Sequence, residues 1–201
     1  MPARAKLTPM TVPLRKPWTQ AEFFTWAETQ SIRYEFDGTR PVAMTGATSG
    51  HNRITRNLIT ALTNRLQTGP CEPLGSDAAV ETINKAVRYP DALVTCSKLD
   101  NDGRLTPGVV VIFEVLSPSS GRIDRYTKVV EYAAVSSIRR YVIIESTSAN
   151  LTVLTRSTAS DPWLTSVLTG NDILRISEIG IEIPVSEIYA RMGFPDDTTN
   201  D

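Results

Sequence analysis

The chain has 201 residues and a formal net charge of −1, with 41% hydrophobic and 21% charged residues. This length and composition predict one globular domain with a sizeable core and exclude an intrinsically disordered chain. The near-zero charge excludes a uniformly cationic surface for nucleic acid, but it allows a local binding groove. No apolar run reaches the roughly 18 to 20 residues that span a bilayer, so we expect a soluble protein without membrane contact.

The chain contains two cysteines, Cys71 and Cys96. It has no segment with the charged start, apolar centre and cleavage site of a secretory signal peptide. These two features favour a reducing cytoplasm. We therefore expect both cysteines to be free thiols.

The two ends of the chain differ from the rest in composition. Residues 1–17 carry four prolines and four basic residues without any acidic residue, so we interpret them as a flexible arm. This arm is either a solvated tail or a segment that binds phosphate. Residues 193–201 are interpreted as a flexible C-terminal tail, which leaves residues 18–192 as a single domain.

The first predicted elements are a short helix and a hairpin. Thr19 and Glu22 form a capping-box pattern, which predicts a helix that ends near Thr29. Asp37 and Gly38 separate two short apolar stretches and predict a hairpin turn. From His51 onward, a helix is indicated by apolar residues at fourfold spacing, namely Ile54, Leu58, Leu62 and Leu66.

The middle of the chain then changes to the pattern of strands. Four strands are expected, at residues 71–75, 78–83, 91–96 and 109–116. The last is apolar on both faces and should be central in the sheet. Residues 122–135 predict a helix and residues 139–146 a further buried strand, and this order is typical of a parallel crossover.

The crossover helix is expected to bury a face containing Ile123, Tyr126, Val130 and Ala133 or Ala134. By the same apolar spacing, Tyr34, Tyr126 and Tyr132 are interpreted mainly as core residues. Residues 150–157 and 163–170 predict an edge hairpin, and residues 185–192 a closing helix capped by Ser186. The expected fold is an α/β sandwich around a mixed sheet.

Glu114 is a carboxylate within the apolar run of residues 109–116. A buried carboxylate costs several kcal/mol unless a cation or hydrogen-bond donors meet it, so Glu114 should have a partner. Asp91 follows Pro90 at the start of the preceding strand, where proline is tolerated. If these two strands are antiparallel neighbours, Asp91 and Glu114 lie opposite each other and face one cleft.

Two close carboxylates repel unless a cation neutralises them. Hard divalent ions such as Mg²⁺ choose such oxygen ligands, together with water and phosphate. This is the arrangement of a metal-dependent phosphodiesterase. Lys128, on the helix that follows the strand of Glu114, is placed to reach back and to orient a water or stabilise charge on phosphate.

Several stretches resemble the Uma2 family, also called DUF820, of the PD-(D/E)xK nuclease superfamily. They are "YPD", "FEVLSPSS", "DRYTK", "EYA" and "RRYVIIE", preceded by "RYEFDGTRPVAMTGATSGHNRITRNL" and "GSDAAV". The resemblance covers roughly residues 18–190. It implies a restriction-endonuclease-like core, a mixed β-sheet flanked by helices, with an N-terminal helix and β-hairpin extension.

The resemblance also implies roles for individual residues. Asp91 and Glu114 match the metal-binding acids, and Glu35 matches an acidic residue in the N-terminal part of the site. Lys128 matches a lysine displaced onto the helix, because the usual lysine position two residues after the second acid is Leu116 here. Activity therefore depends on whether Lys128 reaches the site.

Each of these residues also has a structural interpretation. Asp91 could bond to nearby backbone amides, Glu114 could pair with Arg88 or Arg122, and Lys128 could be a solvated helix residue. Glu35 could pair with Arg33 or Arg40. His51, the single histidine, is either a cap or hydrogen-bonding residue or a second-rank site residue, and Asp77 is structural or assists from outside the ligand set.

The function that we expect is a Mg²⁺-dependent endonuclease acting on DNA, with Mn²⁺ as a substitute ion. Asp91 and Glu114 hold the metal, Glu35 supports it, and Lys128 acts on the attacking water. The alternatives are a nucleic-acid-binding or structural module on the same fold, and a small-molecule enzyme with the same cleft. A homodimer is an expected arrangement, because a double-strand cut usually needs two active sites.

Overall fold

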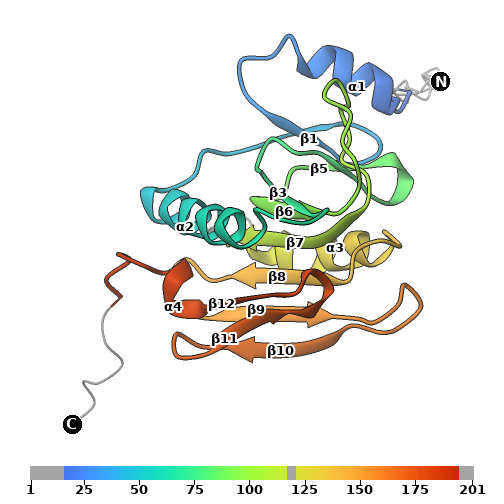
Figure 1. The fold of residues 1–201 in the computed structure, drawn as a ribbon. Helices are drawn as coiled ribbons and strands as arrows, with labels where there is room; N and C mark the ends of the chain where they lie inside the picture. The colour runs from blue at the N-terminus through green and yellow to red at the C-terminus, as the bar shows by residue number, and fades with distance from the viewer. Residues whose placement is uncertain (1–15, 117–120, 195–201) are drawn as a thin grey trace, which may run out of the picture.

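The structure, a computed structural model, describes residues 16–116 and 121–194, with the side chains of the second range described from Tyr126 onward. A six-stranded sheet lies at the centre (Figure 1), with the strand order β10-β9-β8-β7-β6-β3. Its strands are β3 (Glu72–Gly75), β6 (Ala92–Thr95), β7 (Val109–Val115), β8 (Arg140–Ile144), β9 (Leu151–Thr155) and β10 (Leu164–Leu168). The mixed α/β architecture predicted from the sequence is confirmed.

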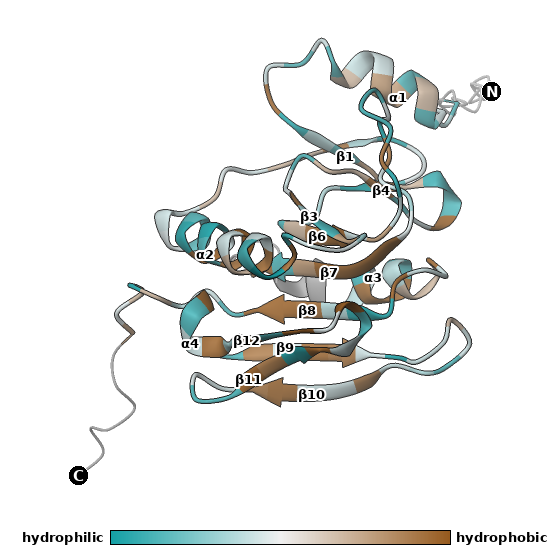
Figure 2. Cartoon of the chain, viewed as in Figure 1, coloured by the Kyte–Doolittle hydropathy of each residue, from teal (hydrophilic) through white to brown (hydrophobic). Residues whose placement is uncertain are grey.

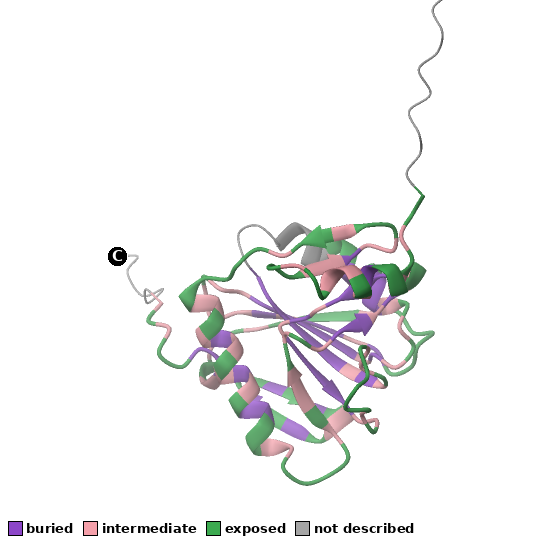
Figure 3. Cartoon of the chain, turned by 90° about the horizontal axis from the view of Figure 1, so that it is seen from above, coloured by how far each residue is buried: buried purple, intermediate pink, exposed green. Residues whose placement is uncertain are grey.

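The strand pairing follows the predicted topology. β7 and β8 are parallel and joined through α3 (Gly121–Ala133), and every other neighbouring pair in this sheet is antiparallel. β7 and β8 carry almost continuous apolar residues, brown in Figure 2, and nearly all of their residues are buried. Seen from above, the strands in the middle of the molecule are largely purple, which marks buried residues (Figure 3). The sequence predicted this central position, because a strand covered on both sides has no polar face.

Helices cover the two faces of the sheet. The face with Val111, Phe113 and Val142 packs against α2 (Ser49–Arg65), whose residues Ile54 and Leu58 are fully buried. The same side is covered by the hairpin β11 (Ile173–Ile176) and β12 (Ile181–Pro184) and by α4 (Val185–Ile188), with the 3-10 turn η2 (Ser177–Ile179) inside the hairpin. The opposite face packs against α3. The amphipathic helix predicted after His51 is thus confirmed.

A smaller unit lies beside the main sheet and contains α1 (Gln20–Ala27). Its four-stranded sheet has the order β2-β1-β5-β4. The strands are β1 (Tyr34–Phe36), β2 (Pro41–Ala43), β4 (Val80–Glu81) and β5 (Val87–Arg88), and the 3-10 turn η1 (Ile83–Lys85) joins the last two. The capping box of Thr19 and Glu22 is present. Phe23 of α1 stacks on Phe36 of β1 with 5.1 Å between the ring centroids, which attaches the helix to the sheet.

The expected hairpin turn joins β1 to β2, and Tyr34 pairs with Ala43. Gly38 has φ +90°, a region that glycine adopts without strain. Asp37 stabilises the turn because its Oδ1 accepts the backbone N–H groups of Thr39 and Arg40. The turn therefore pairs β1 with β2 and places Glu35 opposite Val42.

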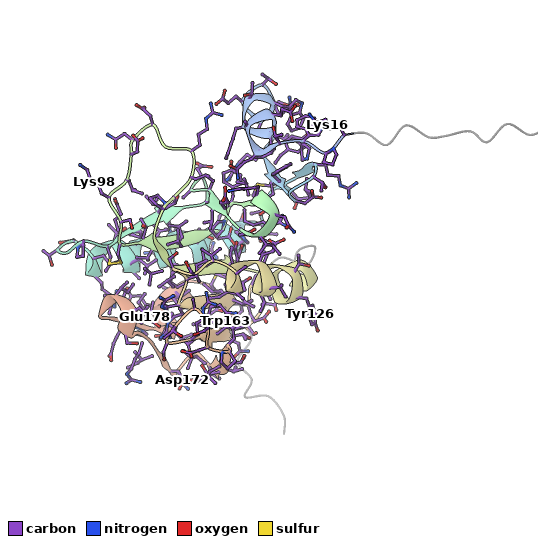
Figure 4. All side chains as sticks on the ribbon, turned by 90° about the vertical axis from the view of Figure 1, so that its right-hand side faces the viewer. Lys16, Lys98, Tyr126, Trp163, Asp172 and Glu178 are labelled. Atoms are coloured by element: carbon purple, nitrogen blue, oxygen red, sulfur yellow. A yellow bond between two sulfur atoms is a disulfide. The ribbon has the colours of Figure 1, made fainter. Side chains whose placement is uncertain are left out.

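The predicted buried face of α3 is wrong in part. Tyr126 and Val130 are 71% and 63% exposed, and Figure 4 shows Tyr126 on the outer side of the helix. The buried side carries Lys128, Glu131 and Tyr132 instead. A helix that buries paired charges does not follow the apolar period, so the apolar spacing identified the outer face.

The predicted closing helix is shorter than expected. It comprises Val185–Ile188, and Ser186 lies inside it and not at its cap. The residue at the N-cap is Pro184, which makes no side-chain cap hydrogen bond. Of the two predicted termini, residues 1–15 and 195–201 lie outside the described residues.

The two cysteines are not free thiols. Cys71 and Cys96 form a disulfide between residues that adjoin the paired strands β3 and β6. The register pairs Glu72 with Thr95, so the cysteines come next to each other at the ends of these strands. The small number of cysteines and the absence of a signal-peptide pattern suggested free thiols, whereas strand pairing brought the two sulfur atoms together.

Across the described residues, none of the helices combines the length and the apolar character that crossing a membrane requires.

Candidate functional site

Asp91 lies where the chain enters β6. Because Ala92 pairs with Phe113, Asp91 comes next to Glu114 in the antiparallel register of β6 and β7, as expected. The Asp91 Oδ2 atom accepts the backbone N–H of Val115 at 2.7 Å and lies 3.1 Å from Nε2 of His51. The carboxylate is thus fixed by the neighbouring strand and by the first turn of α2.

Glu114 extends from β7 towards α3, and its side chain is 5% exposed. Its Oε1 atom accepts hydrogen bonds from Lys128 Nζ at 2.8 Å and from the Tyr132 hydroxyl at 2.9 Å. Lys128 and Tyr132 are one helical turn apart and therefore share a face of α3. Among the described side chains, Lys128 is a partner of the buried carboxylate and Arg88 is not, whereas Arg122 lies outside the described side chains.

Burial, together with the nearby Glu114 carboxylate, raises the pKa of Tyr132 well above its ordinary value. The phenol therefore stays protonated and remains a hydrogen-bond donor. Lys128 is itself only 7% exposed, so it is not a solvated surface lysine. From the described part of α3, Glu114 thus receives a charged donor, Lys128, and a neutral donor, Tyr132.

Glu35 reaches the same region from β1 of the smaller sheet. Its Oε2 atom accepts a hydrogen bond from Arg88 Nη1 at 2.9 Å, and its Oε1 atom lies 3.5 Å from Lys128 Nζ. The backbone N–H of Tyr89 also donates to Glu35 Oε1. The structural partners considered from sequence are wrong, because Arg33 pairs with Asp77 and Arg40 with Asp37.

Sequence reasoning missed the pair formed by Arg88 and Glu131. Nε and Nη2 of Arg88 donate to the two carboxylate oxygens of Glu131, each at 2.6 Å. Both side chains are buried, with 6% and 8% exposed. Two spacings in the sequence could have indicated this pair. Glu131 is three residues from Lys128 on α3, and Arg88 is three residues before Asp91.

The two second-rank residues differ in their positions. His51 contacts Asp91 through its ring, and its backbone N–H donates to the Thr48 cap of α2. Asp77 forms an ion pair with Arg33 at 3.2 Å, and its side chain is 91% exposed. Among the described contacts, His51 therefore meets Asp91, and Asp77 meets neither Asp91 nor Glu114.

The sequence was then compared with known proteins. The family model described as "Uma2: Putative restriction endonuclease" matches residues 20–186. The chain belongs to the Uma2 family. The family predicted from the motifs is therefore confirmed.

Two curated relatives of the Uma2 chain come from Synechocystis sp. (strain ATCC 27184 / PCC 6803 / Kazusa). "Uncharacterized protein slr1290" is 30% identical over 175 residues, which cover 86% of this chain and 92% of that protein. "Uncharacterized protein sll1609" is 27% identical over 140 residues, which cover 68% of this chain and 79% of that protein.

A solved structure has the same fold. It is described as a "putative nuclease belonging to DUF820 from Anabaena variabilis ATCC 29413" and superimposes with a TM-score of 0.65. The superposition covers 86% of this chain and 98% of the other, at 13% sequence identity. The similarity confirms the nuclease-like fold expected of a Uma2 protein.

Leu116 is the position at which this Uma2 chain departs from the superfamily pattern. It is 5% exposed and packs in the core between the sheet and α3. Leucine supplies no charge there, but Lys128 places an ammonium group beside Glu114 from the helix. A cation is therefore present next to Glu114 although its strand, β7, is not followed by the usual lysine.

Proposed function

We propose that this protein is a Mg²⁺-dependent endonuclease that hydrolyses phosphodiester bonds in DNA. The observation that carries the proposal is the placement of Asp91 and Glu114 on adjoining strands, with Lys128 Nζ 2.8 Å from Glu114. The description of the family as a restriction endonuclease supports the same reaction class.

The donor set fits Mg²⁺. No three His, Cys, Asp or Glu side chains among the described residues form a ready metal site. Mg²⁺ does not need one, because it commonly binds through one or two carboxylates and keeps several waters. Asp91 and Glu114 would hold it.

The chain's own residues would divide the chemistry between them. When bound, Mg²⁺ polarises the phosphate and makes its water a better nucleophile. Lys128 donates hydrogen bonds towards the attacking water or the phosphate and stabilises the growing negative charge. Hydrolysis forms a bond from the water oxygen to phosphorus and breaks the bond to one ester oxygen, which takes up a proton. Tyr132 and Glu35 hold Glu114 and Lys128 in place.

One observation favours a second candidate function, a nucleic-acid-binding module without catalysis. Leu116 occupies the usual lysine position and is buried in the core. If Lys128 serves only to neutralise Glu114, the fold would bind nucleic acid without cleaving it. Catalysis and binding are separable by experiment.

The deciding experiment incubates labelled single-stranded, duplex and branched DNA with the protein and Mg²⁺ or Mn²⁺. The wild type is compared with Asp91→Asn and Glu114→Gln. Glu182→Gln is the matched control, because it removes an exposed carboxylate of β12 that pairs with Arg175. Binding of Mn²⁺ to all four proteins is measured by calorimetry.

The proposal is supported if the wild type and Glu182→Gln cleave DNA, whereas Asp91→Asn and Glu114→Gln lose both cleavage and Mn²⁺ binding. Tight Mn²⁺ binding by Asp91→Asn and Glu114→Gln would refute the ligand assignment. Retention of DNA without cleavage by the wild type would favour the binding module.

We also propose that duplex cleavage requires a homodimer, because two strands need two active sites. Sedimentation with and without duplex DNA tests this. A protein that cuts both strands in one event as a monomer would contradict it.

A further inference from the structure

We propose that Arg88 is a positioning residue: by binding Glu131 and Glu35, it keeps the Lys128 ammonium group paired with Glu114. The inference rests on the proposed nuclease function for its catalytic consequence, whereas its structural part stands on the contacts alone. Arg88 is the last residue of β5, three residues before Asp91. Its side chain is buried, so it acts through other residues and does not contact substrate.

Arg88 engages two carboxylates at once. It binds both oxygens of Glu131 at 2.6 Å and one oxygen of Glu35 at 2.9 Å. A guanidinium can do this because its donors are planar and point in fixed directions. The side chain therefore joins α3 to β1.

Both carboxylates are competitors for Lys128. Glu131 is three residues from Lys128 on α3, a spacing at which helical side chains meet. Glu35 Oε1 already lies 3.5 Å from Lys128 Nζ, compared with 2.8 Å for Glu114 Oε1. In a buried site each unpaired carboxylate attracts the nearest cation strongly, because solvent screens it little.

The hydrogen bonds from Arg88 to Glu131 and Glu35 weaken the attraction of these carboxylates for Lys128. Lys128 is then held against Glu114, on the strand that adjoins Asp91. Without Arg88, the described part of the site would contain three carboxylates and the ammonium group of Lys128, and Lys128 would move towards Glu35 or Glu131. This explains how Lys128 of α3 can take the role of the lysine that the superfamily usually carries at the position of Leu116.

The test replaces Arg88 by Met and combines this change with Glu131→Gln. We expect Arg88→Met to lower kcat by about 10- to 100-fold, the range for residues that orient a metal site from outside. KM for DNA should stay within about threefold of the wild-type value, because Arg88 does not contact the bound DNA. The double variant should recover part of the lost kcat, because Glu131→Gln neutralises one of the two carboxylates that Arg88→Met releases.

The matched control is the pair of Arg140 and Glu178. Arg140, like Arg88, is buried and binds both oxygens of one glutamate. Arg140→Met and Arg140→Met with Glu178→Gln report the effect of losing such a pair on the fold alone. We expect these variants to change Tm but not kcat. If Arg88→Met does not fold, Arg88→Lys replaces it, since lysine keeps the charge without the planar arrangement of donors.

A second readout does not depend on activity. Crystal structures of the wild type and of the Arg88 variant measure the distance from Lys128 Nζ to Glu114 Oε1. Departure of Nζ from Glu114 in the variant supports the inference, even if the wild type proves not to be a nuclease. Lys128 remaining at hydrogen-bond distance from Glu114, or an active wild type whose kcat is unchanged by the variant, overturns it.

Discussion

Lys128 Nζ lies 2.8 Å from Oε1 of Glu114. The helix α3 therefore supplies a cation beside this carboxylate of β7, whereas the position two residues after Glu114 is Leu116. The two residues are fourteen positions apart and meet because α3 crosses back over the sheet between β7 and β8. The crossover that completes the fold thus also completes the candidate site.

Replacement of Lys128 by Met should lower both stability and cleavage. It leaves Glu114 without this cation, and breaking a buried pair costs about 3–5 kcal/mol in the free energy of unfolding. Cleavage should fall by about 10²- to 10³-fold, as when a donor to developing charge is removed. Denaturant unfolding and single-turnover cleavage measure the two effects. Lys98→Met is the control, because Lys98 is exposed on the loop before β7 (Figure 4).

If Lys128→Met were as stable and active as Lys98→Met, Lys128 would have neither role.

Replacement of His51 by Ala should weaken metal binding more than it weakens the fold. His51 Nε2 contacts the Asp91 oxygen that also accepts the Val115 N–H. Loss of such a supporting contact commonly weakens metal affinity by about 10- to 100-fold. Mn²⁺ titration followed by electron paramagnetic resonance measures the change, with Asn52→Ala at the exposed neighbouring position as control. Equal affinities in the two variants would show that His51 does not orient Asp91.

Removal of the disulfide should destabilise the protein without abolishing its fold. The bridge closes a loop with a sequence separation of 25, for which the chain-entropy relation gives about 3.5 kcal/mol in the free energy of unfolding. Urea unfolding of Cys71→Ser with Cys96→Ser tests this value. Alkylation followed by mass spectrometry tests the bridge itself: neither cysteine of the native protein should react before reduction. Reaction of both cysteines without a reductant would disprove the bridge.

Stability should fall in alkaline solution. Burial raises the pKa of Tyr132 well above 10.0, and it also raises the pKa of Tyr89 and Tyr189. The folded state therefore keeps these protons where the unfolded chain releases them. Their contribution is fully present below about pH 10 and is lost as the pH rises towards the folded-state values.

Urea unfolding between about pH 8 and about pH 11 measures this dependence. Tyr132→Phe should be less stable at neutral pH by about 1.5–3 kcal/mol, because Glu114 loses a donor. Its stability should nevertheless decline less steeply above pH 10 than that of the wild type. Parallel declines in the two proteins would show that Tyr132 does not contribute.

The sequence by itself determined several local elements and the parallel crossover from β7 through α3 to β8. The capping box at Thr19, the fourfold apolar spacing after His51 and the apolar run of β7 depend on residues only a few positions apart. The adjacency of Asp91 and Glu114 was predicted on the condition that their strands are antiparallel neighbours, and the pairing of β6 with β7 meets that condition. The family pattern supplied the roles expected of these acids.

Only the tertiary structure decided which charges and sulfur atoms meet. Arg88 is 43 residues from Glu131 and 53 from Glu35, and Cys71 is 25 residues from Cys96. No periodic pattern encodes such distant pairs, because each depends on how separate elements pack. The buried face of α3 was missed for the same reason: Lys128 and Glu131 can be buried only because β7 and β5 present Glu114 and Arg88 to them.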